Sequence, residues 1–186
     1  MARERHHLFH TPAGFDDPIE MLLGCHRRIE KQLATLLRLR DHLSSHGVDA
    51  EASGAAQAVL AYFERAAHHH HQDEEVDLFP LLESRITDPG ERARFNAFRT
   101  SLERDHRAME NAWARLRKPL EGIAEGLTRP LPESDVQAFA SAYAHHILAE
   151  ESALQEFVNR WLGPADQEAL GRAMAARRGV SPPRAF

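Results

Sequence analysis

Apolar residues recur every three or four positions along most of the chain, which is the spacing of amphipathic α-helices. The stripes predict long helices over about residues 18–44, 59–87, 95–120 and 133–162, and a shorter helix over about 166–178. No stretch alternates polar and apolar residues as a half-buried strand would. The fold class is therefore expected to be all-α.

Helix boundaries follow from capping residues and prolines. Asp16-Asp17-Pro18 gives an acidic cap and a first-turn proline at the start of the first helix, and Gly163-Pro164 ends the fourth. Pro80 and Pro119 are expected to bend their helices, with a loop from Gly122 to Pro132. These signals divide the chain into an arm (1–15), a bundle domain (16–162), a short C-terminal helix (163–179) and a tail (180–186).

Histidines interrupt the apolar stripes in a repeated pattern. The chain carries H-H-x-x-x-E-E twice, so that Glu74 follows His70 by four residues and Glu150 follows His146 by four. Four residues advance a helix by about one turn, which places each imidazole and carboxylate on the same face. An upstream histidine accompanies each copy, since His26 and His106 lie on the first and third stripes. The repeat implies two helical hairpins, each with one His on its first helix and a His-Glu pair on its second.

Rotation about the helix axis selects among neighbouring residues. His70 lies about 20° from Val59 and Phe63 in projection, whereas His71 is displaced by about 100°. The same argument favours His146 over His145. The remaining neighbours are secondary: Glu30 and Glu110 are weaker candidate ligands, Cys25 is expected to pack beside the site, and Asp73, Glu75 and Glu151 are expected to face outward.

The predicted burial of these polar groups needs compensation, because an unpartnered carboxylate or imidazole loses several kcal/mol on leaving water. A layer of His-Glu hydrogen bonds would explain any single pair. Four histidines and two glutamates at matching depth in four stripes favour a metal centre. The predicted ligands are His26, His70, Glu74, His106, His146 and Glu150.

Composition narrows the classes of partner. The chain has 42% hydrophobic and 27% charged residues and a formal net charge of −5, which gives no general attraction to nucleic acid. We find no signal-peptide pattern and no apolar run of transmembrane length, so a cytoplasmic protein without a membrane partner is expected. The single cysteine excludes an internal disulfide.

These residues resemble the hemerythrin-like, or HHE cation-binding, domains, whose pattern is H…HxxxE…H…HxxxE. The resemblance covers about Asp17 to Leu162 and includes Asp17-Pro18-Ile19 and the segment from Glu74 to Pro80. It implies an antiparallel up-down four-helix bundle holding two non-haem iron ions, with the four histidines as terminal ligands and Glu74 and Glu150 as bridges. Imidazole and carboxylate ligands also suit zinc or manganese, which stand as alternatives.

The sequence departs from the oxygen-carrying hemerythrins, which have a second histidine on the third helix where this chain has Glu110. The ligand set is closer to that of the repair-of-iron-centres proteins, but residues 1–15 are too short for their cysteine-bearing domain. We expect a protein that binds dioxygen, nitric oxide or peroxide for storage, sensing or detoxification, rather than an enzyme. The alternatives are an enzyme consuming peroxide or nitric oxide, an iron-centre repair or iron-donor protein, and a bundle with a structural metal. Self-association stays open.

Overall fold

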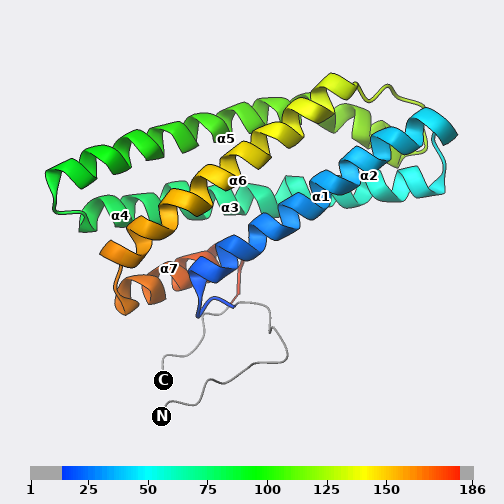
Figure 1. Ribbon diagram of the computed structural model, residues 1–186. Coiled ribbons are helices and arrows are strands. Elements are labelled where there is room, and N and C mark those ends of the chain that lie inside the picture. Colours follow the sequence, from blue (N-terminus) through cyan, green and yellow to red (C-terminus); the bar gives the residue numbers. More distant parts are fainter. Residues whose placement is uncertain (1–13, 181–186) are drawn as a thin grey trace, which may run out of the picture.

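The computed structural model describes residues 14–180, which are almost wholly helical (Figure 1). The segments are α1 (Pro18–His46), α2 (Ala50–Tyr62), η1 (Phe63–Ala67), α3 (His68–Gln72), η2 (Asp73–Leu78), α4 (Phe79–Arg85), α5 (Pro89–Ala124), α6 (Glu133–Trp161) and α7 (Pro164–Arg177). No strand occurs within this part of the chain. The all-α prediction is therefore confirmed. The predicted arm and tail lie mostly outside the described residues.

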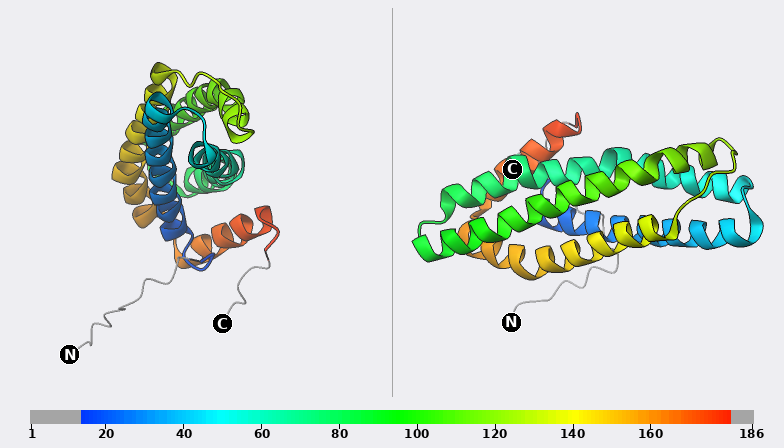
Figure 2. Two further views of the ribbon diagram at one scale, coloured as in Figure 1. Left: turned by 90° about the vertical axis from the view of Figure 1, so that its right-hand side faces the viewer. Right: turned by 90° about the horizontal axis from the view of Figure 1, so that it is seen from above.

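Four long rods form an up-down bundle, because α2, η1, α3, η2 and α4 continue one another as a single rod. This second rod, which runs from residue 50 to residue 85, packs against α1 and α5. α5 packs against α6, and α6 returns to α1, which closes the ring of four (Figure 2). α7 lies outside the ring, against the start of α1 and the η2 segment. None of the helices in residues 14–180 is long and apolar enough to cross a membrane.

Aspartates cap three of the rods at their N-termini. Asp17, Asp49 and Asp88 each accept a hydrogen bond from the backbone N–H three residues on. The cap at Asp49 starts α2 at Ala50, so the small-residue segment before Val59 is helical, although the second helix was predicted to begin only at about residue 59. Its alanines favour the helix once the cap satisfies the first free N–H groups.

α5 continues through Pro119 to Ala124, two residues beyond the predicted start of the loop at Gly122. Proline removes only one backbone hydrogen bond, and the buried side chains of Leu116, Leu120 and Ile123 hold this turn against the core.

Two π-helical segments, η1 and η2, interrupt the second rod on either side of the histidine run. Their i→i+5 backbone pattern widens the helix, and such segments occur frequently at functional sites. η2 ends just before Pro80, whose ring would clash with the carbonyl four residues earlier in a regular α-helix. The periodicity of the sequence did not predict these segments.

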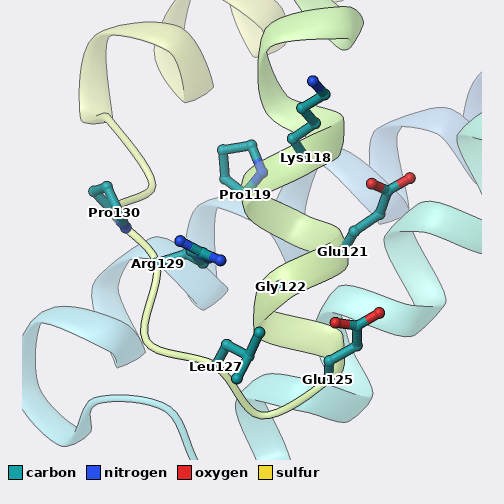
Figure 3. Close-up of a pocket in the computed structure, with 8 residues that line it drawn as sticks. All are labelled: Lys118, Pro119, Glu121, Gly122, Glu125, Leu127, Arg129 and Pro130. Atoms are coloured by element: carbon teal, nitrogen blue, oxygen red, sulfur yellow. The ribbon is translucent and has the colours of Figure 1, made fainter.

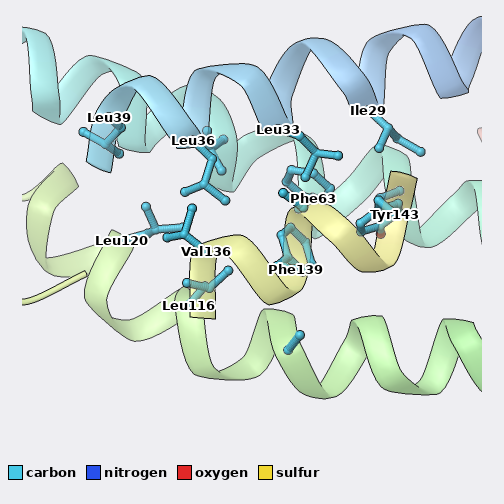
Figure 4. Packing of buried hydrophobic residues seen from close by; sticks show 14 of the residues in the cluster. Ile29, Leu33, Leu36, Leu39, Phe63, Leu116, Leu120, Val136, Phe139 and Tyr143 are labelled. Carbon is cyan, nitrogen blue, oxygen red and sulfur yellow. The ribbon is translucent and has the colours of Figure 1, made fainter. Parts of the chain in front are cut away.

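The apolar core of residues 14–180 consists of two clusters. One occupies the half of the bundle near the α1–α2 turn and includes Leu36, Phe63 and Phe139 (Figure 4). The other occupies the opposite half and includes Phe79, Phe95 and Phe157. Between them lies a layer of buried histidine and glutamate side chains. The fold therefore places the polar residues of the repeat between two apolar clusters.

Candidate metal centre

One histidine from each of the four rods reaches the centre of the bundle. His26 on α1 lies with its Nε2 3.1 Å from Nε2 of His70 on α3. His106 on α5 lies with its Nε2 3.2 Å from Nε2 of His146 on α6. All four side chains are buried. The rods thus present two pairs of imidazole nitrogens.

Two buried glutamates lie between the pairs. The Glu74 oxygens are 3.0 Å from Nε2 of His70 and 3.2 Å from Nε2 of His106. Glu150 Oε2 is 3.2 Å from Nε2 of His26 and 3.3 Å from Nε2 of His146. Each carboxylate therefore contacts one histidine of each pair, which is the arrangement that a ligand bridging two ions requires.

The ligand atoms fall into two groups that could each hold a cation. Within each group, these atoms lie within 4.8 Å of one another. The first group is His26, His70, Glu74 and Glu150, and the second is Glu74, His106 and His146. The structure brings the six predicted residues together in one cluster.

The second glutamate of each repeat orients a histidine from a different rod. His26 Nδ1 donates to Glu151 Oε1 at 2.9 Å, and His106 Nδ1 donates to Glu75 Oε1 at 2.6 Å. Because a carboxylate accepts hydrogen bonds, these contacts place the proton on Nδ1 and leave the Nε2 lone pair directed at the centre. Glu75 and Glu151 lie at the surface as predicted, but they also contact the site.

The centre of the cluster is surrounded by acceptor atoms. Neither oxygen of Glu74, nor Oε2 of Glu150, has a hydrogen-bond partner among residues 14–180. The Nε2 atoms of His26 and His106 add lone pairs that point to the same region. Buried carboxylates without partners are costly, and cations that accept these lone pairs would remove the cost. The donor set therefore fits metal ions.

The pKa shifts show how the metal-free cluster compensates for this crowding. Burial alone would lower the pKa of His26 and of His106, but the neighbouring glutamates raise each above its ordinary value. Burial would raise the pKa of Glu74, but attraction to His70 and His106 holds it well below the usual range. For Glu150, burial and repulsion by Glu74 would raise the pKa. The contacts with His146 and His26 outweigh both effects and hold this pKa below its ordinary value. Both carboxylates are thus ionised at neutral pH.

The residue that follows the candidate ligand histidine is buried in both copies of the repeat, His71 in the first and Ile147 in the second. His71 is buried, and its ring stacks on that of His106 with centroids 4.0 Å apart. His145, which precedes the candidate ligand His146 and corresponds to His69 in the first copy, is exposed, and its Nδ1 donates to the carbonyl oxygen of Ser141. His71 is therefore a packing neighbour of a candidate ligand, which its position 100° from the stripe did not predict.

The other secondary residues divide between surface and interior. Glu30 and Glu110, the weaker candidate ligands, are exposed and belong to neither group. Cys25 is buried, as expected. The prediction that Asp73 faces outward is wrong, because its side chain is fully buried against arginines of the C-terminal segment. The doubling of Glu in both repeats was the signal that could have pointed to Glu75 and Glu151.

A small apolar cavity reaches the candidate ligands from the surface between α1 and α6. It has a volume of about 20 Å³ and is lined by His26 and Glu150 together with leucines such as Leu22 and Leu154. A wider pocket of about 580 Å³ lies at the α5–α6 loop, with Pro119 and Arg129 on its wall, and touches none of the six ligands (Figure 3). The first cavity therefore places a small, mostly apolar space beside two of the candidate ligands.

Comparison with known proteins agrees with this geometry. Residues 17–158 match the family model described as "Hemerythrin HHE cation binding domain". The chain is also similar to a protein of Haemophilus influenzae, described as an uncharacterized protein, with 31% identity over 168 residues, which is 90% of this chain and 94% of the relative. The matched range includes every residue of both ligand groups. The chain belongs to the hemerythrin HHE cation-binding domain family.

Proposed function

We propose that this protein is a non-haem di-iron protein that binds dioxygen or a related small ligand, nitric oxide or peroxide, for storage, sensing or detoxification. The observation that carries the proposal is the buried cluster of four imidazoles and two carboxylates whose free lone pairs converge between two apolar clusters.

The proposed ligands have separate roles. His26 and His70 would be terminal ligands of one ion, and His106 and His146 of the other. Glu74 and Glu150 would bridge, because each lies within 3.3 Å of a histidine from both pairs. Glu75 and Glu151 hold two of the imidazoles in the tautomer that binds metal through Nε2.

The surroundings of the cluster support small-ligand binding. Six protein ligands leave open coordination positions on a pair of ions, and an iron pair would supply there the electrons that small oxidants accept. The cavity beside His26 and Glu150 is small and lined mostly by apolar side chains, which favours a molecule of only a few atoms. Leu22 and Leu154 contribute to the apolar part of its wall, beside the polar Gln155.

Iron is proposed over zinc and manganese because of the family resemblance and the number of ligands. A structural zinc site has four ligands in a closed tetrahedron and commonly includes cysteine. In this cluster Glu74 and Glu150 each contact a histidine of both pairs, and Cys25 belongs to neither ligand group.

Metal analysis of the protein purified from iron-supplemented cells tests the proposal. We expect about two iron ions per chain from the two ligand groups, and an absorption spectrum that changes on reduction. His70→Ala and Glu150→Ala should each lose most of the iron, whereas the matched exposed change His145→Ala should keep it. Equal losses in all three variants would contradict the assignment of ligands.

Exposure of the anaerobic ferrous protein to dioxygen, nitric oxide or peroxide distinguishes a ligand-binding protein from an enzyme and from a protein with a structural metal. A lasting spectral change that reverses when the ligand is removed supports binding. Rapid consumption of peroxide or nitric oxide without a lasting change would indicate an enzyme. No reaction with any of the three, together with a large loss of thermal stability when metal is removed, would indicate a structural metal.

A further inference from the structure

An ion cluster connects the C-terminal helix to the segment that carries Glu74. The carboxylate of Asp73 is 0% exposed. Arg178, which follows α7, binds it in a fork, with Nη1 to Oδ1 at 3.1 Å and Nη2 to Oδ2 at 2.6 Å. Arg177 Nε donates to the same Oδ1 at 2.9 Å, and Arg177 also binds Asp77. Two guanidinium groups from one helix end thus hold two carboxylates of η2.

The bound segment is the one that places Glu74 in the metal centre. Asp73 and Glu74 are consecutive, and one contacts the end of α7 while the other contacts His70 and His106. Both belong to the π-helical segment η2. Because π-helical hydrogen-bond geometry is rarely stable for long, a six-residue stretch of it needs support from neighbouring elements.

The ion pair between Asp73 and Arg178 is better suited to holding η2 in one position than to adding stability. A buried ion pair adds little stability compared with apolar residues of similar size, because both charges lose their hydration. A guanidinium fork on a carboxylate instead defines the position and orientation of both groups. The Asp73–Arg178 contact is therefore suited to fixing where η2 lies.

α7 itself is anchored independently of these arginines. Leu170 and Met174 are buried in the apolar cluster at this end of the bundle. Gly171 brings α7 against the backbone of Phe15, since a Cβ atom at this position would lie 1.9 Å from the Phe15 carbonyl oxygen. α7 also lies beyond residues 17–158, so it is an addition to the matched family domain.

We propose that α7 is a latch on the metal centre, with Arg177 and Arg178 as positioning residues. They hold η2 and thereby keep Glu74 between His70 and His106, which limits the rate at which a bound metal ion can leave. The part that concerns metal rests on the proposed function, whereas the restraint of η2 exists in the metal-free protein as well.

The test is Arg178→Gln, with Arg85→Gln as its matched control. Arg85 also pairs with α7, through Asp166 at 2.7 Å, but this contact is at the surface and does not involve η2. Hydrogen exchange of the amides of residues 73–78 is measured in the metal-free proteins. Release of iron to a chelator and the visible spectrum are measured in the loaded proteins.

Arg178→Gln should speed amide exchange in η2 and iron release by about 10-fold or more, and shift the visible spectrum. Arg85→Gln should match the wild type in all three. If Arg178→Gln does not fold, Arg177→Gln, which leaves the fork intact, is measured in the same way and should show smaller effects in the same direction.

Unchanged exchange in η2 would overturn the latch, whether or not the protein binds metal. Faster exchange with unchanged iron release would overturn the link to Glu74. Wild-type protein that takes up no iron would contradict the proposed function, and the exchange measurement would still decide whether α7 restrains η2.

Discussion

At the scale of single residues, the two consecutive glutamates of each repeat have different roles. The first of each pair, Glu74 or Glu150, faces the cluster, and the second orients a histidine of another rod. Only the histidines of α1 and α5 have such a carboxylate, since Nδ1 of His70 and of His146 has no hydrogen-bond partner in residues 14–180. The orientation of the centre thus depends on residues that are not themselves candidate ligands.

Removing the orienting carboxylate should weaken metal binding without removing a ligand. Glu151→Ala frees the His26 ring and its tautomer, so the affinity for iron should fall by about 10- to 100-fold. Glu156→Ala is a control further along α6, because Glu156 lies at the surface, where it pairs with Arg94. Competition with a chelator of known affinity measures both. Equal affinities in the two variants would show that Glu151 does not orient the ligand.

Protons should compete with metal at the histidines. In the metal-free protein the neighbouring glutamates outweigh burial and raise the pKa of His26 and of His106, and a protonated Nε2 cannot bind metal. Affinity for iron should therefore fall with acidity, beginning above the ordinary histidine pKa of about 6.5. Chelator competition across neutral and mildly acidic pH measures this. An affinity that falls only below that value would contradict the raised pKa values.

At the scale of elements, the two hairpins show what periodicity can and cannot predict. On α6 a regular helix separates His145 from His146 by one step of rotation, and the choice of the buried residue follows the rule. On the second rod, which η1 and η2 interrupt, both His71 and Asp73 are buried although they lie away from the apolar stripe. Ile147, which corresponds to His71, is also buried although α6 is regular, so the π-helical segments do not explain the burial of His71. Asp73 is buried against the arginines at the end of α7, a contact that a rotation of about 100° per residue cannot predict.

Replacing two helical glycines, Gly54 and Gly171, with alanine should change the stability of the protein in opposite directions. A Cβ atom added at Gly54, in α2, would meet no side chain and no other element within 4 Å, so Gly54→Ala should stabilise the protein by about 0.5–1 kcal/mol. Gly171 in α7 lies against the backbone of Phe15, so Gly171→Ala must displace α7 and should lower the melting temperature. Thermal unfolding of both variants measures this. A neutral effect at Gly171 would show that α7 does not pack closely on the N-terminal segment.

At the scale of the whole molecule, the bundle and its polar layer could be predicted because both depend on one regularity. Four apolar stripes require four helices that bury their faces together, and a histidine within each stripe must then reach the centre. The roles of Asp73, Arg177 and Arg178 could not be predicted in this way. They depend on where α7 packs, and a short helix outside the ring has no periodic relation to the repeat.

Metal binding and folding should be linked, because the cluster assembles only when all four rods are in place. A ligand present at about 100 times its dissociation constant stabilises the folded state by about 2.7 kcal/mol. For a chain of 186 residues this corresponds to a rise in melting temperature of about 5–11 °C. Calorimetry with and without iron measures the rise in the wild type and in Glu150→Ala. Since that variant lacks a ligand shared by both histidine pairs, its melting temperature should rise much less, and an equal rise would place the bound iron elsewhere.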